Sequence, residues 1–179
     1  METTKNKLTP YESNFFDKMR NYLDTKIYFY GSVQREDYFS GKSDIDVDIF
    51  TENMNSTITK MQNLLNVNRN NFIKVVIKPL NKNGIINGYK LKYAEPENNL
   101  HVEFSIYDSK YKDEILYEHN RKTKLPFIIS ILLSTIKYLY YNIGIIPKTI
   151  YLKIKNFLIN LVDYGGYKNF VSIDDYKNI

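Results

Sequence analysis

The sequence contains no cysteine and no tryptophan, and its single alanine is Ala94. Without cysteine the chain cannot form a disulfide framework, a thiolate zinc site or a cysteine nucleophile. Two histidines, His101 and His119, do not have the spacing of a zinc site either. The lack of cysteine fits a reducing compartment, so we expect a cytoplasmic protein.

Long apolar runs are also absent. Residues 1–10 are polar and contain no apolar segment of the kind found in a secretory signal peptide. The most apolar stretch, residues 126–136, is shorter than the roughly 20 residues that span a membrane. We interpret it as a buried helix and expect no membrane partner.

Arginine is scarce, with four residues against 21 lysines, whereas isoleucine (22), asparagine (21) and tyrosine (17) are abundant. A/T-rich codons encode these abundant residue types, which fits a large DNA virus, a low-G+C bacterium or a parasite. The net charge of +5 is therefore weak support for nucleic-acid binding. Its distribution is more informative: residues 1–108 carry 14 basic and 14 acidic side chains, and residues 109–179 carry 11 and 6.

The length of 179 residues fits one domain with an ordinary globular composition. Thr9, Pro10 and Glu12 form a capping box that predicts a helix up to about Asp24. A second helix is expected over residues 56–66, with Asn55 or Ser56 as its cap. Apolar and alternating runs predict strands over residues 27–30, 44–50, 72–78, 86–93 and 100–107.

The last two strands flank a turn-rich segment at residues 95–99, which predicts an antiparallel hairpin. From about residue 110 the pattern is helical: Pro126 begins a helix that Gly144 can end, and Pro147 begins another that runs to about Asn160. The tail from Tyr164 is expected to be irregular. We predict an α/β (α+β) fold with a mixed sheet and flanking helices, in which residues 1–108 form the core and residues 109–179 a helical part of the same domain.

The residues that carry chemistry lie around two strand ends. The first strand ends in Gly31-Ser32, where glycine lets backbone N–H groups approach an anion and serine adds a hydroxyl donor. Asp44 and Asp46 begin the second strand on one face, with Cβ atoms roughly 6–7 Å apart. Such carboxylates repel each other unless a cation neutralises them, and oxygen ligands favour Mg²⁺ or Mn²⁺.

A third acid is expected from a neighbouring strand. Glu103 fits, because Val102 and Phe104 take the core face while Glu103 takes the other. Asp108 is a weaker candidate that is better placed as a strand-end cap. Asp48 shares the face of the aspartate pair, and we interpret it as an exposed or lysine-paired carboxylate, with metal binding as the alternative.

Gly-Ser, a following arginine and Ser-Asp-Ile-Asp together resemble the polymerase-β-like nucleotidyltransferase superfamily, over about residues 27–108. The chain is most similar to minimal, single-domain members, including small viral X-family polymerases. The resemblance implies that Gly31 and Ser32 hold a nucleoside triphosphate and that Asp44 and Asp46 bind the metal chelated by its phosphates. Glu103 would share a second metal and help to deprotonate the attacking hydroxyl. The sequence departs from the family in its 13-residue Gly31–Asp44 spacing and in having glutamate as the third acid.

Other polar residues have two readings each. Arg35 and Lys42 can contact triphosphate oxygens or be solvated loop charges. Ser43 can assist through its backbone or belong to a turn, and His119 is expected to be exposed. A lysine run with interleaved Tyr89 and Tyr93 can follow a phosphate backbone, or it can be a solvated sheet face; its lysines are Lys74, Lys78, Lys82, Lys90 and Lys92.

These observations predict a metal-dependent nucleotidyltransferase. It would move a nucleoside monophosphate from an NTP such as ATP to an acceptor hydroxyl and release pyrophosphate. The positive charge of residues 109–179 favours RNA or DNA as the acceptor, and a small molecule or a protein hydroxyl is the alternative. A non-catalytic module that binds nucleotide or nucleic acid on the same fold is the competing interpretation. A hydrolase is disfavoured, because no nucleophile–base arrangement is visible.

Overall fold

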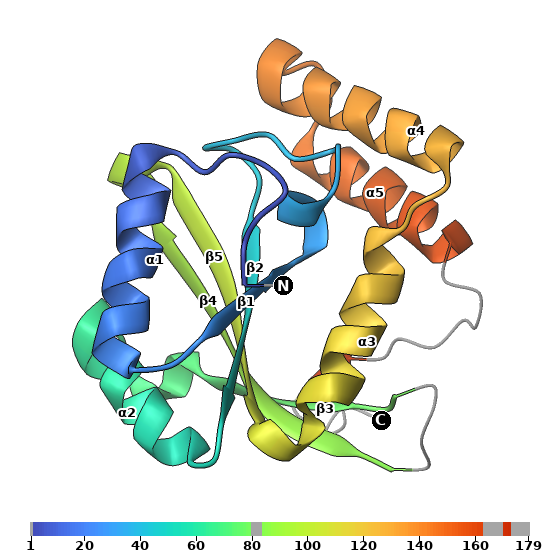
Figure 1. Cartoon of the computed structure of the whole chain (residues 1–179). Helices are drawn as coiled ribbons and strands as arrows, with labels where there is room; N and C mark the ends of the chain where they lie inside the picture. The colour runs from blue at the N-terminus through green and yellow to red at the C-terminus, as the bar shows by residue number, and fades with distance from the viewer. Residues whose placement is uncertain (1, 80–83, 163–169, 173–179) are drawn as a thin grey trace.

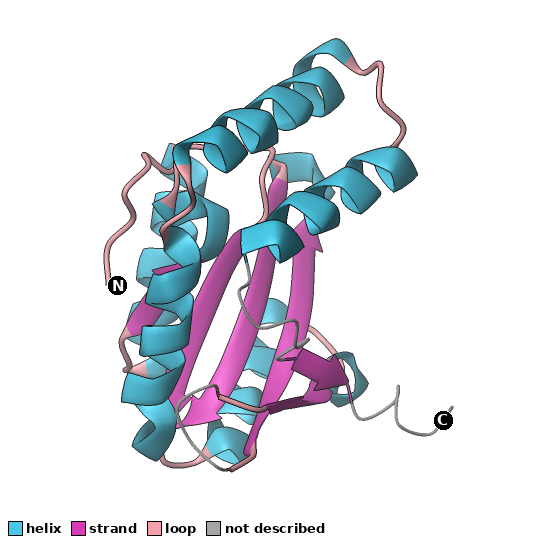
Figure 2. Cartoon of the chain, turned by 90° about the vertical axis from the view of Figure 1, so that its right-hand side faces the viewer, coloured by secondary structure: helices cyan, strands magenta, loops and turns pink. Residues whose placement is uncertain are grey.

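The alternating segments form one mixed sheet in the computed structural model, which describes residues 2–79, 84–162 and 170–172. Its strands lie in the spatial order β1-β2-β5-β4-β3-β6 (Figures 1 and 2). β2 and β5 are parallel and the other neighbouring pairs are antiparallel, which confirms the mixed sheet and the β4–β5 hairpin. The strand bounds are β1 Ile27–Tyr30, β2 Ile45–Thr51, β3 Ile73–Ile77, β4 Ile86–Glu95, β5 Leu100–Asp108 and β6 Phe170–Ser172.

Helices cover both faces of the sheet. In Figure 1, α1 and α2 lie on one side of the sheet, α3 on the other, and α4 and α5 beyond the upper end of α3. A short 3₁₀ turn, η1 (Gly31–Gln34), follows β1, and a π-helical turn, η5 (Leu139–Ile143), continues α4. The helix bounds are α1 Pro10–Leu23, α2 Met54–Leu65, α3 Lys112–Thr123, α4 Phe127–Tyr138 and α5 Lys148–Val162.

Most helix ends follow the predicted signals. The capping box at Thr9 is present, and Gly144, with φ of 72°, ends the π-helical turn that follows α4. The predicted cap of the second helix is wrong, because α2 begins earlier and Asn53 accepts a hydrogen bond from the Ser56 N–H at 3.0 Å. In the tail, Tyr164 lies outside the described residues, and β6 contradicts the expectation of an entirely irregular segment.

One face of the sheet carries the larger apolar core. Alternate residues of β2 and β5 point toward α1 and α2, as the alternation predicts. Burial of this face against two amphipathic helices leaves the opposite face for polar side chains. The cluster includes Phe16, Met19, Ile45, Val47, Ile49, Ile58, Met61, Val102, Phe104 and Ile106.

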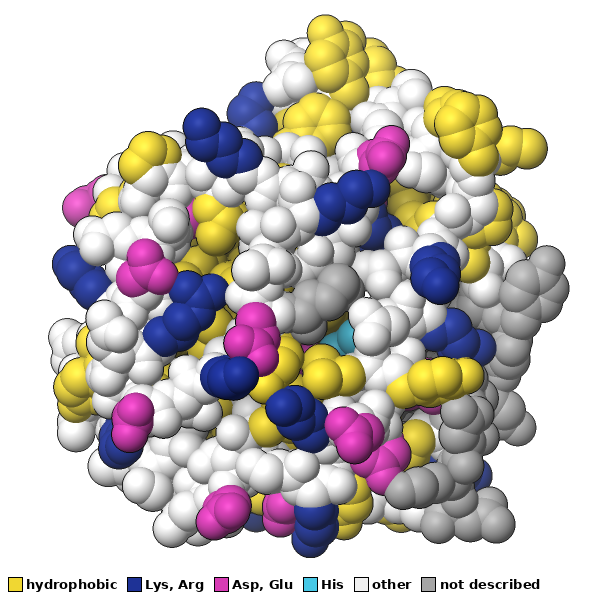
Figure 3. Space-filling view, viewed as in Figure 1, with side chains coloured by type: hydrophobic (Ala, Val, Ile, Leu, Met, Phe, Trp, Pro, Cys, Tyr) yellow, Lys and Arg dark blue, Asp and Glu magenta, His cyan; other side chains and the backbone are white. Residues whose placement is uncertain are grey.

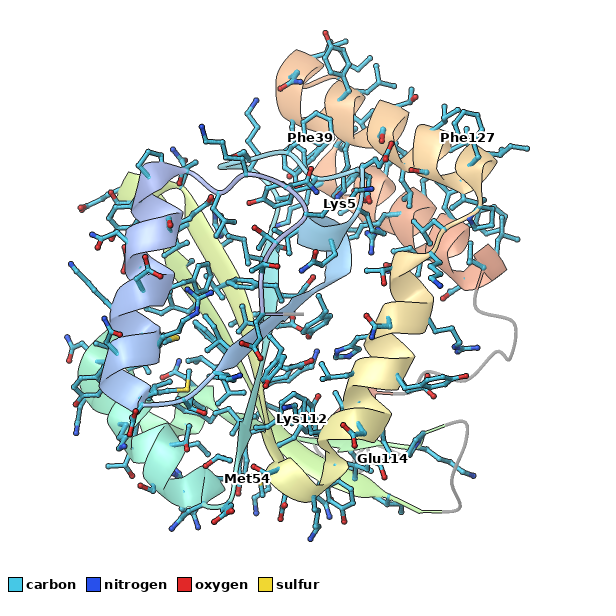
Figure 4. All side chains as sticks on the ribbon, viewed as in Figure 1. Lys5, Phe39, Met54, Lys112, Glu114 and Phe127 are labelled. Carbon is cyan, nitrogen blue, oxygen red and sulfur yellow. The ribbon has the colours of Figure 1, made fainter. Side chains whose placement is uncertain are left out.

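The opposite face changes from polar to apolar along β2. Asp44 is exposed, Asp46 is partly buried, and Asp48 and Phe50 are buried. The apolar end is covered by α3, whose first residue, Lys112 (labelled in Figure 4), places its ammonium group 4.7 Å from the ring centroid of Tyr28. On β2, the described residues of this face are thus accessible near Asp44 and buried beyond Asp46.

The outer surface of α4 and α5 is unusually apolar. The interpretation of residues 126–136 as a buried helix is therefore wrong, because only Leu133 and Ile136 of this stretch are buried. Twelve of the seventeen exposed large hydrophobic side chains among the described residues lie between Phe127 and Leu161. Figure 3 shows several separate hydrophobic groups at the top and upper right of the molecule, and Phe127, labelled in Figure 4, is 79% exposed. No helix in the described part of the chain combines the length and the apolar character needed to cross a membrane.

Candidate active site

Gly31 brings the backbone after β1 directly against the second aspartate. Its φ of +69° is in the left-handed region, and a Cβ atom added there would lie 1.9 Å from Asp46 Oδ2. Tyr30, the residue before it, pairs with Asp46 across β1 and β2. Ser32 is buried beside it, and its hydroxyl donates to the main-chain oxygen of Asp44 at 3.4 Å. Only glycine, which has no Cβ atom, allows the Asp46 carboxylate to approach this turn so closely.

Asp46 and Glu103 are neighbours on the two parallel strands, since they are register partners of β2 and β5. Burial, and then the negative charge of Glu103, raise the pKa of Asp46 to about 7. Burial also opposes the ionisation of Glu103, but the charges of Lys90 and Lys92 outweigh it and hold the pKa of Glu103 below its usual range. The pKa values of these two adjacent acids are thus shifted in opposite directions, which is typical of a functional site.

Two lysines of β4 hold the Glu103 carboxylate. The ammonium group of Lys90 pairs with Glu103 Oε1, and that of Lys92 lies 3.7 Å from Oε2. The Lys90 side chain is 20% exposed and the Lys92 side chain 82% exposed. Glu103 is therefore a paired carboxylate here, as well as a neighbour of Asp46.

Asp48 contradicts the expectation of an exposed or lysine-paired carboxylate. It is fully buried, and its Oδ2 lies 2.6 Å from Nδ1 of His119 in α3. The expected exposure of His119 is wrong for the same reason: its ring is 5% exposed and stacks on Tyr30 at 3.8 Å between centroids. Because α3 packs over this part of β2, Asp48 Oδ2 and the His119 ring pair with each other away from water, whereas the buried Asp48 Oδ1 has no hydrogen-bond partner among the described residues.

A cavity of about 140 Å³ opens beside the aspartates and has two walls. One wall comes from the segment between β1 and β2, and the other from α4, η5 and α5. Lys155 of α5 carries positive charge toward Asp46 and Glu103, as the effect of its charge on both pKa values shows. The first wall consists of Gly31, Ser32, Arg35, Ser43, Asp44 and Asp46, and the second of Lys137, Tyr141, Tyr151, Lys155 and Ile159.

A buried ionic group joins the two walls below the cavity. Asp37 is fully buried, and its carboxylate accepts from Arg35 Nε at 2.7 Å and lies 2.9 Å from Lys137 Nζ. Lys137 also donates to the main-chain oxygen of Asp37 at 2.6 Å. Burial lowers the pKa of Lys137, and the two cations together hold the pKa of Asp37 below its usual range despite its burial. This group anchors α4 to the loop before β2.

The other predicted loop residues divide between the cavity and its rim. Arg35 lines the cavity while it pairs with Asp37. Ser43 also lines it, and its hydroxyl accepts from the Phe39 N–H at 3.1 Å, which is a turn contact. Lys42 lies outside the lining and donates to the Tyr141 main-chain oxygen at 3.2 Å and to Asn142.

The residues of β4 do not form one nucleic-acid surface. Lys90 and Lys92 lie on the face of Glu103, whereas Tyr89 and Tyr93 pack against the core cluster on the opposite face. The interpretation of a continuous track of lysines and stacking rings is therefore wrong. Lys82 lies outside the described residues. Asp108 acts as the predicted strand-end cap, since it accepts from the Lys110 N–H at 3.0 Å.

The donor chemistry of the site fits a hard divalent cation. Asp44 and Asp46 line the same cavity, both offer carboxylate oxygens, and burial together with the charge of Glu103 raises the pKa of Asp46 despite the charges of Lys90 and Lys155. The described residues contain no group of three His, Cys, Asp or Glu side chains placed to hold a metal, and Glu103 pairs with Lys90. The pair Asp44/Asp46 is thus the candidate metal site.

Lys155, Lys137, Tyr141 and Tyr151 were not identified as site residues from the sequence. A signal does exist for two of them. Lys155 lies at helical spacing from the buried residues Tyr151 and Leu158, and Lys137 lies four residues after buried Leu133. A lysine within the inward stripe of an amphipathic helix has to meet an acid or a ligand, because an unpaired buried ammonium group is costly.

Gly31→Ala should disable the site, and Gly41→Ala is a matched control. Both glycines have φ of +69°, so both substitutions carry the left-handed strain of roughly 1–2 kcal/mol. Only the Cβ atom at residue 31 would collide with Asp46, because the nearest atom at Gly41 is 3.8 Å away. We expect Gly31→Ala to lower metal affinity at least about tenfold beyond Gly41→Ala, measured by calorimetric titration with Mn²⁺. Equal affinities in the two variants would contradict this account of Gly31.

A comparison with known proteins identifies the family of the chain. A family model described as "Nucleotidyltransferase domain" matches residues 13–138, which include β1 to β5 and every acidic residue of the site. No curated protein and no solved structure matches the chain.

Proposed function

Because the chain belongs to the nucleotidyltransferase domain family, within the polymerase-β-like superfamily, we propose that it transfers a nucleoside monophosphate from an NTP to an acceptor hydroxyl. The observation that carries this proposal is the shared cavity. It brings the Gly31-Ser32 turn, the carboxylates of Asp44 and Asp46, and the Lys155 ammonium group to one place. These are the donors, acids and cation that a triphosphate and its counterion require.

The donor and cationic groups of the cavity would bind the triphosphate. Backbone N–H groups of η1 and the Ser32 hydroxyl would bind phosphate oxygens, with Lys155 opposite them as a countercharge. Arg35 lies in the same lining but is already bound to Asp37, so its role would be to position the loop as well as to add charge. The chain's main contribution is the alignment of the α-phosphate and the acceptor oxygen for in-line attack.

Asp44 and Asp46 would hold Mg²⁺ or Mn²⁺, and Glu103 would join Asp46 for a second ion. When bound, such ions neutralise charge on the phosphates and lower the pKa of the attacking hydroxyl. Asp46 would supply the carboxylate common to both positions, because it lies beside the Gly31 turn and beside Glu103.

We propose a nucleic acid as the acceptor. The second wall of the cavity comes from a segment, residues 126–162, that contains four lysines and no acidic residue. Two of these lysines line the cavity itself: Lys137, whose charge is neutralised by Asp37, and Lys155. A surface with this charge attracts a polyanion to the site at which the hydroxyl would react.

A transfer assay with labelled nucleotides tests the function. The protein is incubated with Mg²⁺ or Mn²⁺, each of the four α-³²P-labelled NTPs, and an RNA or a DNA oligonucleotide. We expect label on the oligonucleotide with release of pyrophosphate, no label from γ-³²P-labelled NTP, and loss of transfer in Asp44→Ala. A protein or small-molecule hydroxyl is tested in parallel as acceptor.

The competing module without catalysis makes a different prediction. It would bind nucleotide in a calorimetric titration but would transfer label to no acceptor. If transfer is absent everywhere and Asp44→Ala leaves the nucleotide affinity unchanged, the enzymatic function is excluded. Transfer to an acceptor of another kind would keep the activity and overturn the choice of nucleic acid.

A further inference from the structure

The Lys90 ammonium group lies beside Glu103, where a second metal ion would bind. It pairs with Glu103 Oε1, and Glu103 is the register partner of Asp46. Neighbouring strands lie about 4.8 Å apart, so a cation bridging Asp46 and Glu103 would approach this ammonium group closely. Lys90 comes from β4, on the side of β5 away from Asp46.

We propose that Lys90 competes with the second divalent cation for Glu103. It holds the third carboxylate in the metal-free protein and must withdraw before Glu103 can share an ion with Asp46. This inference rests on the proposed function, since it assumes that Asp44 and Asp46 bind the first ion. In this proposal Lys90 is a positioning residue, because it controls how readily Glu103 joins Asp46 at the second ion.

The surroundings of Lys90 allow this movement. Its side chain is 20% exposed, so the flexible stem can carry the ammonium group to water. Lys92 also faces Glu103, but at 3.7 Å and with 82% exposure, so solvent screens its charge. The two lysines thus place the same ammonium group near the same carboxylate, but one is largely buried and the other exposed. Their effects on metal binding should therefore differ.

Binding of Mn²⁺ to the nucleotide-free protein tests the proposal without an activity measurement. Free Mn²⁺ is followed by electron paramagnetic resonance for the wild type, Lys90→Met, Lys92→Met and Lys90→Arg. We expect Lys90→Met to tighten the second Mn²⁺ at least about tenfold, because it removes a unit charge a few ångströms from the ion. Lys92→Met should change this affinity less than about threefold, owing to screening. Lys90→Arg should resemble the wild type.

The outcomes separate this inference from the proposed function. If Lys90→Met binds the second Mn²⁺ no more tightly than the wild type, Lys90 does not compete, and the inference is overturned while the first site stands. If neither protein binds Mn²⁺ at all, the proposed metal site fails, and the inference with it. Circular dichroism verifies folding, and Lys90→Gln, which keeps a polar side chain without charge, must reproduce the tightening.

Discussion

Asp46→Asn is expected to abolish nucleotidyl transfer, with a loss of about 10³-fold or more. The substitution keeps the shape of the side chain but removes the charge that would be shared by both metal positions, which is worth several kcal/mol in the transition state. Asp46 lies against the Gly31 turn and is the register partner of Glu103. No neighbouring carboxylate can therefore replace it. The rate of label transfer in the assay above measures the effect.

The same substitution should stabilise the metal-free protein at neutral pH. The pKa of Asp46 is raised from 3.8 to about 7 on folding, so the unfolded chain loses this proton first as the pH rises. Wild-type stability therefore falls between about pH 4 and pH 7, whereas Asp46→Asn lacks this loss. We expect the variant to gain about 4 kcal/mol relative to the wild type at pH 7.5 and almost nothing at pH 3.5. Urea unfolding in EDTA measures both values.

Asp108→Asn is the matched control for both measurements. It makes the same chemical change at the far end of β5, where the carboxylate caps η4 outside the cavity. Transfer should be unchanged in this variant. Activity retained by Asp46→Asn would refute the assignment of the site, and a parallel pH dependence of Asp46→Asn and wild type would refute the raised pKa.

Asp37→Ala is expected to cause the largest loss of stability, about 3 kcal/mol or more. It removes the carboxylate that neutralises Lys137 and Arg35, and Lys137 is only 2% exposed. A buried ammonium group without a partner is costly, whereas the ion pair itself contributes little net free energy. Equilibrium unfolding in urea at pH 7 measures the difference in the free energy of unfolding.

Two further variants determine the cause of that loss. Glu36→Ala removes the neighbouring acid, which pairs with Lys5 at the surface, and should leave the unfolding midpoint unchanged. Adding Lys137→Met to Asp37→Ala removes the stranded charge and should restore part of the stability. If the double variant is less stable than Asp37→Ala, the loss comes from packing and not from the uncompensated lysine.

Much of the fold follows from local patterns. Strict alternation in β2 and β5 specifies which residues face the core, and the same alternation places Asp46 and Glu103 on one face. The capping box at Thr9 and the glycine at residue 144 mark helix ends through backbone chemistry that does not depend on the rest of the molecule. Local rules failed by a few residues only at the cap of α2, where Asn53 and Asn55 are both suitable.

The errors arose where distant segments meet. Asp48 and His119 are 71 residues apart, and nothing in either segment shows that α3 closes over β2. Lys90 was interpreted either as part of a phosphate-binding track or as part of a solvated face, whereas its side chain pairs with Glu103, diagonally across from its register partner Ser105. Lys155 reaches the cavity only because α4 and α5 turn back over the loop before β2. Such contacts depend on tertiary packing, which a single sequence does not encode in its periodicity.

The two-walled cavity couples occupancy to the mobility of the helical hairpin formed by α4 and α5. A molecule bound between Ser32 and Lys155 bridges segments that are joined along the chain through β2 to β5, α3 and α4. Because a ligand that contacts both walls stabilises their arrangement by mass action, we expect backbone amides of α5 to gain protection from hydrogen exchange as the site fills. Hydrogen exchange of the hairpin therefore reports how much ligand is bound in the cavity. A substitution that destabilises the hairpin should weaken ligand affinity by the same free energy, even when it lies far from the bound phosphates.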